Sequence, residues 1–350
     1  MRNLNILKDL VLIPSPSGFE EPLAKYIYKH LKPYVKGSNM YIDSMNNLVV
    51  LIPGKTKESI MIDAHSDLCG FVVSNIEKCG LINVQHIGGG VSQTASARHI
   101  NIITDKGIIP AVIDRKHAHL VNDENEEKIE KLSDAQIDIG IRGEENVSKF
   151  VKIGDPCVYT PSFSILNSSA IDGKYIAGYG FDDKSGCFIL IETIKKIVSM
   201  KATPTNTLIF TFSAQEETAY TKVVPLVEKY RPSLFIEADV TFATDYSDNL
   251  EKEVGRCSLG DGIVLYRGVD VANDIVTIMS SIAKKSKSKI KIQYQASNGR
   301  IGYTATEVTH LGPRALILGI PLRNMHSVVE TINTNDLEYG INLLYEFLKI

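Results

Sequence analysis

The sequence lacks a charge excess of either sign, long apolar stretches and paired cysteines. Lys and Arg number 38 against 41 Asp and Glu, which favours neither a nucleic-acid partner nor a membrane surface. No apolar stretch has the length of a membrane span, and the charged residues Lys8 and Asp9 argue against a signal peptide. The five cysteines form no CxxC pair, which indicates a reducing compartment. We therefore expect a soluble, cytoplasmic protein.

Helix and strand patterns alternate at both ends of this 350-residue chain, which is long enough for two domains. Helical periodicity covers residues 3–12 and 20–34, and apolar strands follow at 47–52 and 59–64. After residue 163, the predicted strands are 207–213, 234–238, 291–295 and 315–321. The helices predicted in the same part are 185–200, 222–229, 273–285 and 334–348. This alternation predicts an α/β domain with a mixed, mostly parallel sheet flanked by helices.

The stretch from 70 to 162 has a different character. Short β-like runs follow one another there, at 70–75, 81–85, 99–104, 108–113 and 150–159. Glycine turns such as Gly88-Gly89-Gly90 separate them. We therefore predict a small β-rich domain at 70–162, inserted into an α/β domain that is formed by residues 1–69 and 163–350.

Polar residues follow the apolar strands of the α/β domain. His65 and Asp67 come after one strand, Glu216-Glu217 after a second, Asp239 after a third, and His326 after a fourth. Ligands bind at the carboxyl ends of strands in open α/β sheets, so these side chains are expected to meet there. Asp182-Asp183 precedes the helix at 185–200, where acidic residues can also serve simply as helix caps.

Histidine and carboxylate ligands together suit Zn²⁺ and similar cations. Five candidate ligands (His65, Asp182, Glu217, Asp239 and His326) are too many for one tetrahedral ion, so they predict two ions about 3.5–4 Å apart. Asp67 is expected to accept the free imidazole N–H of His65. Glu216 is then free to act as a general base. His86 and the other histidines of the β-rich insert are interpreted as structural.

These motifs resemble those of the M42 family of metallo-aminopeptidases, and the resemblance covers nearly the whole chain. His65-Ser66-Asp67 is similar to the HxD signature of the family, and Gln215-Glu216-Glu217 to its QEE signature. Gly180-Phe181-Asp182-Asp183 is similar to the segment that carries its bridging aspartate. The residues around Asp239 and the segment Ile320–Ser327 resemble the last two landmarks.

The resemblance implies that one metal binds His65 and Asp239, the other binds Glu217 and His326, and Asp182 bridges them. It implies zinc or cobalt as the metals, peptides as substrates and Glu216 as the base. It also implies a phosphorylase/hydrolase-like catalytic domain with a β-barrel-like insert. Dimers would form through this insert, and six dimers would assemble into a dodecamer.

Three positions depart from the family pattern. Leu68 replaces a frequent acidic residue, Ala219 lies where glycine is usual, and Ala305 lies where aspartate is common. These changes leave the metal ligands intact but put substrate choice and turnover in question. A deacylase or dipeptidase on the same metal plan therefore stays open as an alternative. The second alternative is a weakly active or non-catalytic homologue that binds metal and peptide.

Overall fold

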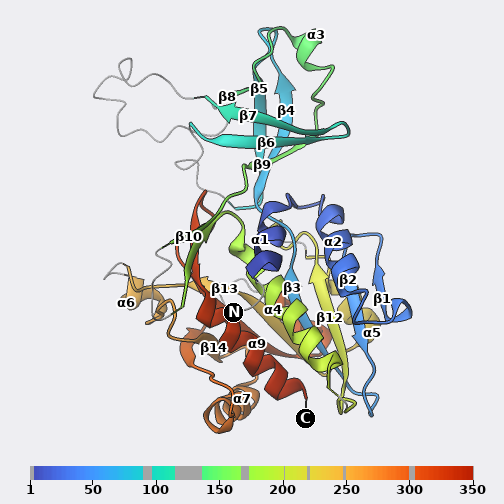
Figure 1. Ribbon diagram of the computed structural model, residues 1–350, viewed down its shortest axis with the longest axis vertical. Helices are drawn as coiled ribbons and strands as arrows, with labels where there is room; N and C mark the ends of the chain where they lie inside the picture. The colour runs from blue at the N-terminus through green and yellow to red at the C-terminus, as the bar shows by residue number, and fades with distance from the viewer. Residues whose placement is uncertain are drawn as a thin grey trace.

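The computed structural model describes residues 4–89, 97–114, 136–166, 173–200, 202–218, 221–246, 250–298 and 304–349. Figure 1 shows a large lobe of helices packed on a sheet, with a small β lobe at one end of the long axis. The chain leaves the large lobe after β3 and returns to it through β10, so the small lobe is an insertion.

An eight-stranded sheet forms the centre of the large lobe. Its order is β1 (Met40–Ile42), β2 (Leu48–Ile52), β12 (Thr207–Ser213), β3 (Ser59–His65), β13 (Leu234–Phe242), β16 (Arg314–Leu322), β14 (Ile263–Gly268) and β15 (Ile292–Ser297). The four central strands β12, β3, β13 and β16 are mutually parallel. Antiparallel pairs flank them at β2–β12 and at β14–β16, which confirms the predicted mixed sheet.

Helices cover both faces of this sheet because its central strands are apolar on both sides. One face packs against α1 (Leu4–Leu12), α2 (Glu21–Leu31), α4 (Phe181–Val198), α7 (Asn273–Lys285) and α9 (Thr334–Leu348). The other face packs against α5 (Val224–Tyr230), α8 (Thr304–Glu307) and the 3₁₀ helix η6 (Val308–Leu311). The short helices η1 (Gly37–Asn39) and α6 (Leu250–Val254) lie outside these two layers.

The small lobe is a closed β barrel with its own apolar core. Its strands run in the order β4 (Gly70–Ile76), β5 (Ile82–Ile87), β8 (Gln136–Asp138), β7 (Gly107–Ile113), β6 (His99–Thr104) and β9 (Pro156–Tyr159). Phe71, Ile100, Ile113 and Ile137 are buried inside it. The predicted run at 150–159 is a strand only from Pro156, because a turn that follows α3 (Glu144–Val147) occupies 150–155.

A separate three-stranded sheet lies between the barrel and the helices (Figure 1). It consists of β10 (Phe163–Leu166), β11 (Tyr175–Gly178) and β17 (Glu330–Asn333), all antiparallel. β11 leads directly into α4, and β17 follows the loop that carries His326. This small sheet therefore ties together two segments that carry candidate ligands. Among the described residues, no helix combines the length and the apolar character needed to cross a membrane.

Candidate metal centre

Strand register places the predicted ligands at one edge of the sheet. His65 is the last residue of β3 and lies beside Ser213, the last residue of β12. Glu216 and Glu217 follow in the next turn, and His326 follows the end of β16. Asp239 lies within β13 rather than after it, since this strand continues to Phe242. The parallel alignment of the four strands brings all of these side chains to the same end.

The carboxylate of Asp182 lies between the two histidines. Its Oδ1 is 3.0 Å from His65 Nε2, and its Oδ2 is 3.1 Å from His326 Nε2. Asp182 belongs to a non-helical turn at the start of α4, where the backbone has not yet taken up helical angles. Each oxygen therefore faces a different histidine, which is the arrangement that a carboxylate bridging two cations requires.

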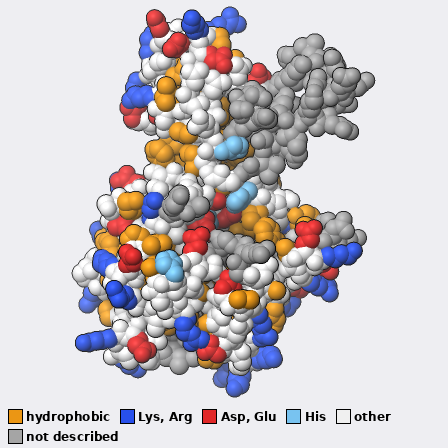
Figure 2. Space-filling view, turned by 180° about the vertical axis from the view of Figure 1, so that it is seen from behind, with side chains coloured by type: hydrophobic (Ala, Val, Ile, Leu, Met, Phe, Trp, Pro, Cys, Tyr) orange, Lys and Arg blue, Asp and Glu red, His pale blue; other side chains and the backbone are white. Residues whose placement is uncertain are grey.

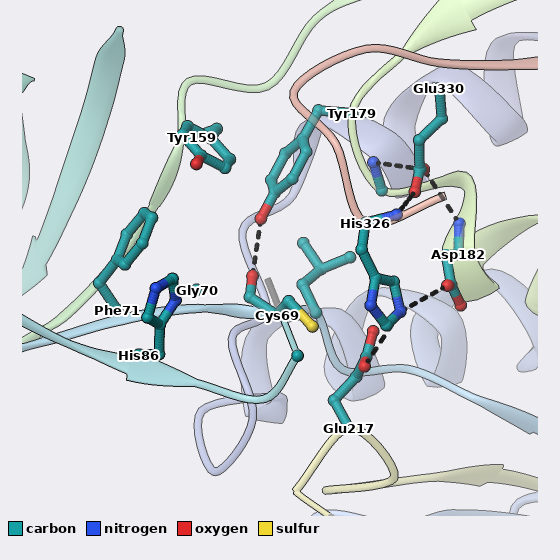
Figure 3. A pocket seen from close by; sticks show the side chains of 13 residues that line it. Cys69, Gly70, Phe71, His86, Tyr159, Tyr179, Asp182, Glu217, His326 and Glu330 are labelled. Carbon is teal, nitrogen blue, oxygen red and sulfur yellow. Dashed lines mark hydrogen bonds and ion pairs between the residues drawn. The ribbon is translucent and has the colours of Figure 1, made fainter. Parts of the chain in front are cut away.

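Two further carboxylates complete the two sides of this cluster. Asp239 Oδ1 is 3.7 Å from His65 Nε2, and Glu217 Oε2 is 3.4 Å from His326 Nε2. His65 and Asp239 thus lie on one side of Asp182, and His326 and Glu217 on the other. Figure 3 shows the second side, with His326 between Asp182 and Glu217. Overlapping groups of His and carboxylate oxygens, such as His65 with Asp182 and Glu217, lie within 4.8 Å of one another.

Asp67 is buried behind the cluster and has more contacts than the sequence predicts. Its Oδ1 is 3.4 Å from His65 Nδ1, an ion-pair contact longer than a well-formed hydrogen bond. The Asp67 carboxylate has shorter contacts with three hydrogen-bond donors. The backbone N–H groups of Glu216 and Glu217 donate to it at 3.0 and 3.1 Å, and the hydroxyl of Ser17 donates to it at 2.6 Å. Asp67 therefore fixes the turn that carries both glutamates as well as facing His65.

The turn that follows β12 is held from several directions. Gln215 adopts a positive φ of 57°, a backbone conformation that L-residues rarely take up. Its N–H donates to Glu20 Oε1, while Asn47 Oδ1 accepts from the N–H of Ala214. Glu20 comes from the N-terminal turn and Asn47 directly precedes β2, so both segments help to fix the turn that carries Glu216 and Glu217.

Glu330 is a site residue that the sequence analysis missed. Its Oε2 accepts from the backbone N–H groups of Gly180, Phe181 and Asp182, and its Oε1 accepts from that of His326 (Figure 3). One buried carboxylate thus joins the Asp182 turn to the His326 loop. The available signal was an acidic residue four positions after His326, directly after the apolar pair Val328-Val329.

The electrostatics of the cluster follow from burial of many acids with few cations. Burial raises the pKa of Glu216 to about 9, and it raises the pKa values of Glu217 and Asp239 to about 7. Neighbouring carboxylates add to each of these shifts. Burial also works against ionisation of Asp182, but hydrogen bonds from the two histidines lower its pKa below the ordinary value.

The pKa values of the two histidines are also raised, which favours their charged forms. The hydrogen bond with Asp182 raises the pKa of His326 to about 9. Burial opposes charge on His65, but Asp182 and Asp67 raise its pKa well above the ordinary value. Five carboxylates thus lie within 4.0 Å of the two histidines. Divalent cations would supply the positive charge that lets all of the acids ionise. The donor set of imidazole nitrogens and carboxylate oxygens fits such cations.

Two cavities meet at the cluster. One has a volume of about 370 Å³, is open to solvent and is lined by the candidate ligands together with Glu216, Phe242, Thr304, Glu307 and Met325. The other, drawn in Figure 3, lies toward the barrel and is lined mainly by Leu68, Phe71, Tyr159 and Tyr179. His86, interpreted as structural from the sequence, lines this second cavity. On the face in Figure 2, acidic and histidine side chains gather at the waist between the two lobes.

Of the positions that depart from the family pattern, Leu68 lines the second cavity, and Ala305 directly follows Thr304, which lines the first. Leu68 is buried, and a side chain at Gly180 would come within 2.7 Å of it. Ala305 is also buried, and its N–H donates to the carboxylate of Glu237 at 2.7 Å. Ala219 lies outside the described residues.

Comparisons with known proteins agree with this geometry. Residues 46–343 match the family model described as M42 glutamyl aminopeptidase. The chain is 25% identical to the lysyl aminopeptidase of Pyrococcus furiosus, over 100% of this chain and 97% of that protein. It is 26% identical to the glutamyl aminopeptidase of Lactococcus lactis, over 94% of this chain and 91% of that protein.

Solved structures show the same fold. A TET aminopeptidase from a marine sediment archaeon of the Thaumarchaeota superposes with a TM-score of 0.89 at 25% identity, covering 99% of this chain and 95% of that one. The TET1 peptidase of Pyrococcus horikoshii superposes with a TM-score of 0.84 at 28% identity, covering 99% and 98%. The latter is described as assembling into a tetrahedron or a large octahedral shell.

Proposed function

Because the chain belongs to the M42 glutamyl aminopeptidase family and is therefore an aminopeptidase, we propose that its cluster holds two divalent metal ions and removes N-terminal residues from peptides with their help. The observation that carries the proposal is the position of Asp182, whose two oxygens face two different histidines. His65 and Asp239 would hold one ion, His326 and Glu217 the other, and Asp182 both. The N and O ligands suit Zn²⁺ or Co²⁺.

Bound metals of this kind supply an acidified water molecule and polarise the scissile carbonyl. The residues of the chain then handle the proton. Glu216 lines the open cavity, and its Oε2 lies 3.9 Å from His65 Nε2, so it borders the position of the reacting water without belonging to either ligand pair. We propose that Glu216 takes the proton of the attacking water and returns it to the leaving amine. Asp67 acts as a positioning residue, since it holds the backbone of Glu216 and faces His65.

A Glu216→Gln variant tests the assignment of the base. The amide keeps the size of the side chain but cannot accept the proton, so kcat should fall by roughly 10²–10⁴-fold. Metal content by elemental analysis should stay at the wild-type value, because Glu216 belongs to neither ligand pair. Glu228→Gln, a change at an exposed residue of α5, is the matched control and should leave kcat unchanged. Wild-type turnover in Glu216→Gln would eliminate Glu216 as the base.

A substrate panel tests the reaction itself. Metal-loaded protein is assayed on aminoacyl p-nitroanilides and on the same compounds carrying an N-acetyl group. The proposal expects hydrolysis only where the α-amino group is free. Release of p-nitroaniline from the N-acetylated set would indicate an endopeptidase, and release of acetate would indicate a deacylase. Bound metal without any hydrolysis would indicate a non-catalytic homologue.

We further propose that the insert at 70–162 mediates self-association into dimers and that these dimers assemble into a dodecamer. Exposed apolar side chains of the barrel support this, including Ile108 and Val112 on the outer face of β7 and Ile153 beside β9. A solved structure with 28% identity is described as a dodecamer, and TET1 of Pyrococcus horikoshii as a tetrahedral or octahedral shell. The catalytic domain would then comprise residues 1–69 and 163–350.

A cytoplasmic location is also proposed. All five cysteines are free, and three of them, Cys157, Cys187 and Cys257, are buried without a disulfide partner. Free buried thiols are typical of proteins that work in a reducing compartment.

A further inference from the structure

Cys69 lies beside one of the two proposed ligand pairs. Its Sγ, a carboxylate oxygen of Glu217 and a ring nitrogen of His326 all lie within 4.8 Å of one another. Figure 3 shows the sulfur at the end of the cavity where Glu217 and His326 meet. The three residues come from three separate segments of the chain, namely the start of β4, the turn after β12 and the loop after β16.

The surrounding structure fixes the position of this sulfur. Tyr179 Oη donates a 2.7 Å hydrogen bond to the backbone carbonyl of Cys69. The next residue, Gly70, has no room for a side chain, because a Cβ there would lie 2.5 Å from the carbonyl oxygen of Cys157. A side chain at Gly88 would come within 2.9 Å of Cys69 Sγ and 3.0 Å of the Glu217 carbonyl oxygen. The thiol is therefore confined next to Glu217.

We propose that Cys69 supplies a thiolate ligand to the metal ion held by Glu217 and His326, which gives that ion sulfur, nitrogen and oxygen donors. This inference rests on the dinuclear centre proposed above. Binding exchanges the thiol proton for the cation: the S–H bond breaks, a sulfur–metal bond forms and the proton leaves to solvent, with no change of oxidation state.

The distances support the ligand. A Zn–S bond of about 2.3 Å and a Zn–N bond of about 2.0–2.1 Å place two tetrahedral ligand atoms roughly 3.5 Å apart. His326 Nε2 and Glu217 Oε2 are already 3.4 Å apart, and the sulfur lies within 4.8 Å of a ligand atom of each of these residues.

A sulfur ligand also distinguishes the two metal positions. The position beside His65 and Asp239 has only nitrogen and oxygen donors within reach among the described residues. Thiolate favours Zn²⁺, Co²⁺ or Cd²⁺ over Mn²⁺ and Mg²⁺. The ion beside Cys69 should therefore exchange less readily for Mn²⁺ than the other ion.

Spectroscopy of the full-length protein loaded with Co²⁺ tests the proposal directly. A cobalt–thiolate bond gives a charge-transfer band in the near ultraviolet, while the weaker visible bands report cobalt binding whatever the ligands. Wild type and Cys79→Ser, which changes an exposed thiol away from the cluster, should both show the near-ultraviolet band. Cys69→Ser and Cys69→Val should lose it and keep the visible bands and the bound cobalt. X-ray absorption of the zinc-loaded wild type should show one sulfur at about 2.3 Å for every two zinc ions.

The outcomes separate this inference from the metal centre on which it rests. Cobalt bound by wild type without a charge-transfer band, or a band that persists in Cys69→Ser, would overturn the thiolate ligand and leave the dinuclear centre standing. Failure of wild type to bind cobalt or zinc would overturn the centre and the ligand together. If the Cys69 variants do not fold, the X-ray absorption of wild type decides, since it needs no substitution.

Discussion

The carboxylate of Glu330 accepts hydrogen bonds from two segments that each carry a candidate ligand. These ligands are Asp182 and His326, and neither is next to Glu330 in the sequence. The three backbone donors of the Asp182 turn lie about 150 positions away from Glu330. Sequence patterns find His65, Glu217 and Asp239 because each accompanies an apolar strand. They do not find Glu330, because its role depends on a fold that brings the start of α4 to the start of β17.

A Glu330→Gln variant should weaken metal binding. The amide nitrogen of Gln cannot accept a hydrogen bond, so either the Asp182 turn or the His326 loop loses its partner. Loss of such a supporting contact typically costs 10–100-fold in metal affinity. The measurement is the metal Kd by competition with a chelator, with Glu338→Gln on the exposed side of α9 as the control. Equal affinity in wild type and Glu330→Gln would exclude the positioning role.

Metal binding should strengthen as pH rises. In the metal-free protein the pKa of His326 is raised to about 9 by Asp182, and burial raises that of Glu217 and Asp239 to about 7. All three groups bind metal only after losing a proton, so below these pKa values protons compete with the cation. The apparent Kd should therefore fall between about pH 6 and pH 9, by up to roughly tenfold per pH unit for each proton displaced. A Kd that does not change over this range would contradict the ligand set.

At the scale of elements, helix α4 lies close against β13 and carries Asp182 at its start. A Cβ on Gly186 would lie 2.3 Å from the carbonyl oxygen of Ala238, and at the same distance from a carboxylate oxygen of the buried Asp183. Only glycine allows this approach between helix and strand. The sequence predicts a helix at 185–200, whereas the structure begins it at Phe181 with two non-helical residues, Asp182 and Asp183. These two residues form the ligand turn, which helical periodicity cannot predict.

A Gly186→Ala variant should therefore destabilise the protein and disturb the ligand turn. Overpacking against backbone typically costs 1–3 kcal/mol of unfolding free energy. Urea unfolding followed by circular dichroism measures this cost, and elemental analysis measures retained metal. Gly37→Ala is a suitable control, because the nearest atom to a Cβ there is Tyr28 Oη at 3.8 Å. A Gly186→Ala protein as stable as Gly37→Ala would show that α4 can move away from β13.

Much of the architecture was predictable from the sequence at this scale, and the exceptions have physical reasons. The helix predicted at 273–285 and the strand predicted at 207–213 coincide with α7 and β12. Strand β14 was not predicted although three of its residues, Ile263, Val264 and Leu265, are fully buried. It follows a Gly-rich turn, and such a short apolar run does not by itself distinguish a strand from a buried helix. The residue pattern alone predicts only a β-rich insert, because closure of a barrel depends on pairings between distant strands; the expectation of a barrel-like insert comes from the family resemblance, and the closed barrel confirms it.

At the scale of the whole molecule, the barrel extends away from the catalytic lobe (Figure 1). It presents apolar side chains to solvent. On β7, Ile108 and Val112 point outward and are 52% and 42% exposed, whereas Ala111 and Ile113 face the barrel core. A strand that is apolar on both faces is typical of an interface. This surface is the one through which we propose that subunits associate.

An Ile108→Glu, Val112→Lys double variant should dissociate the assembly. Charged side chains at a buried contact are costly to desolvate, so the variant should run at a lower mass by size exclusion with light scattering. Its circular dichroism and metal content should match wild type, because both changes point away from the barrel core and from the cluster. Ile278→Glu, on the exposed side of α7, is the control and should keep the wild-type mass. An unchanged mass in the double variant would place the interface elsewhere.

The two-metal centre bridged by Asp182 is the claim on which the mechanism depends. Anomalous diffraction from crystals of the zinc-loaded protein, collected at the zinc absorption edge, measures it most directly. The account predicts two peaks about 3.5–4 Å apart, one on each side of the Asp182 carboxylate, with His65 and Asp239 at one and His326 and Glu217 at the other. A single peak, or two peaks that do not share Asp182, would contradict it.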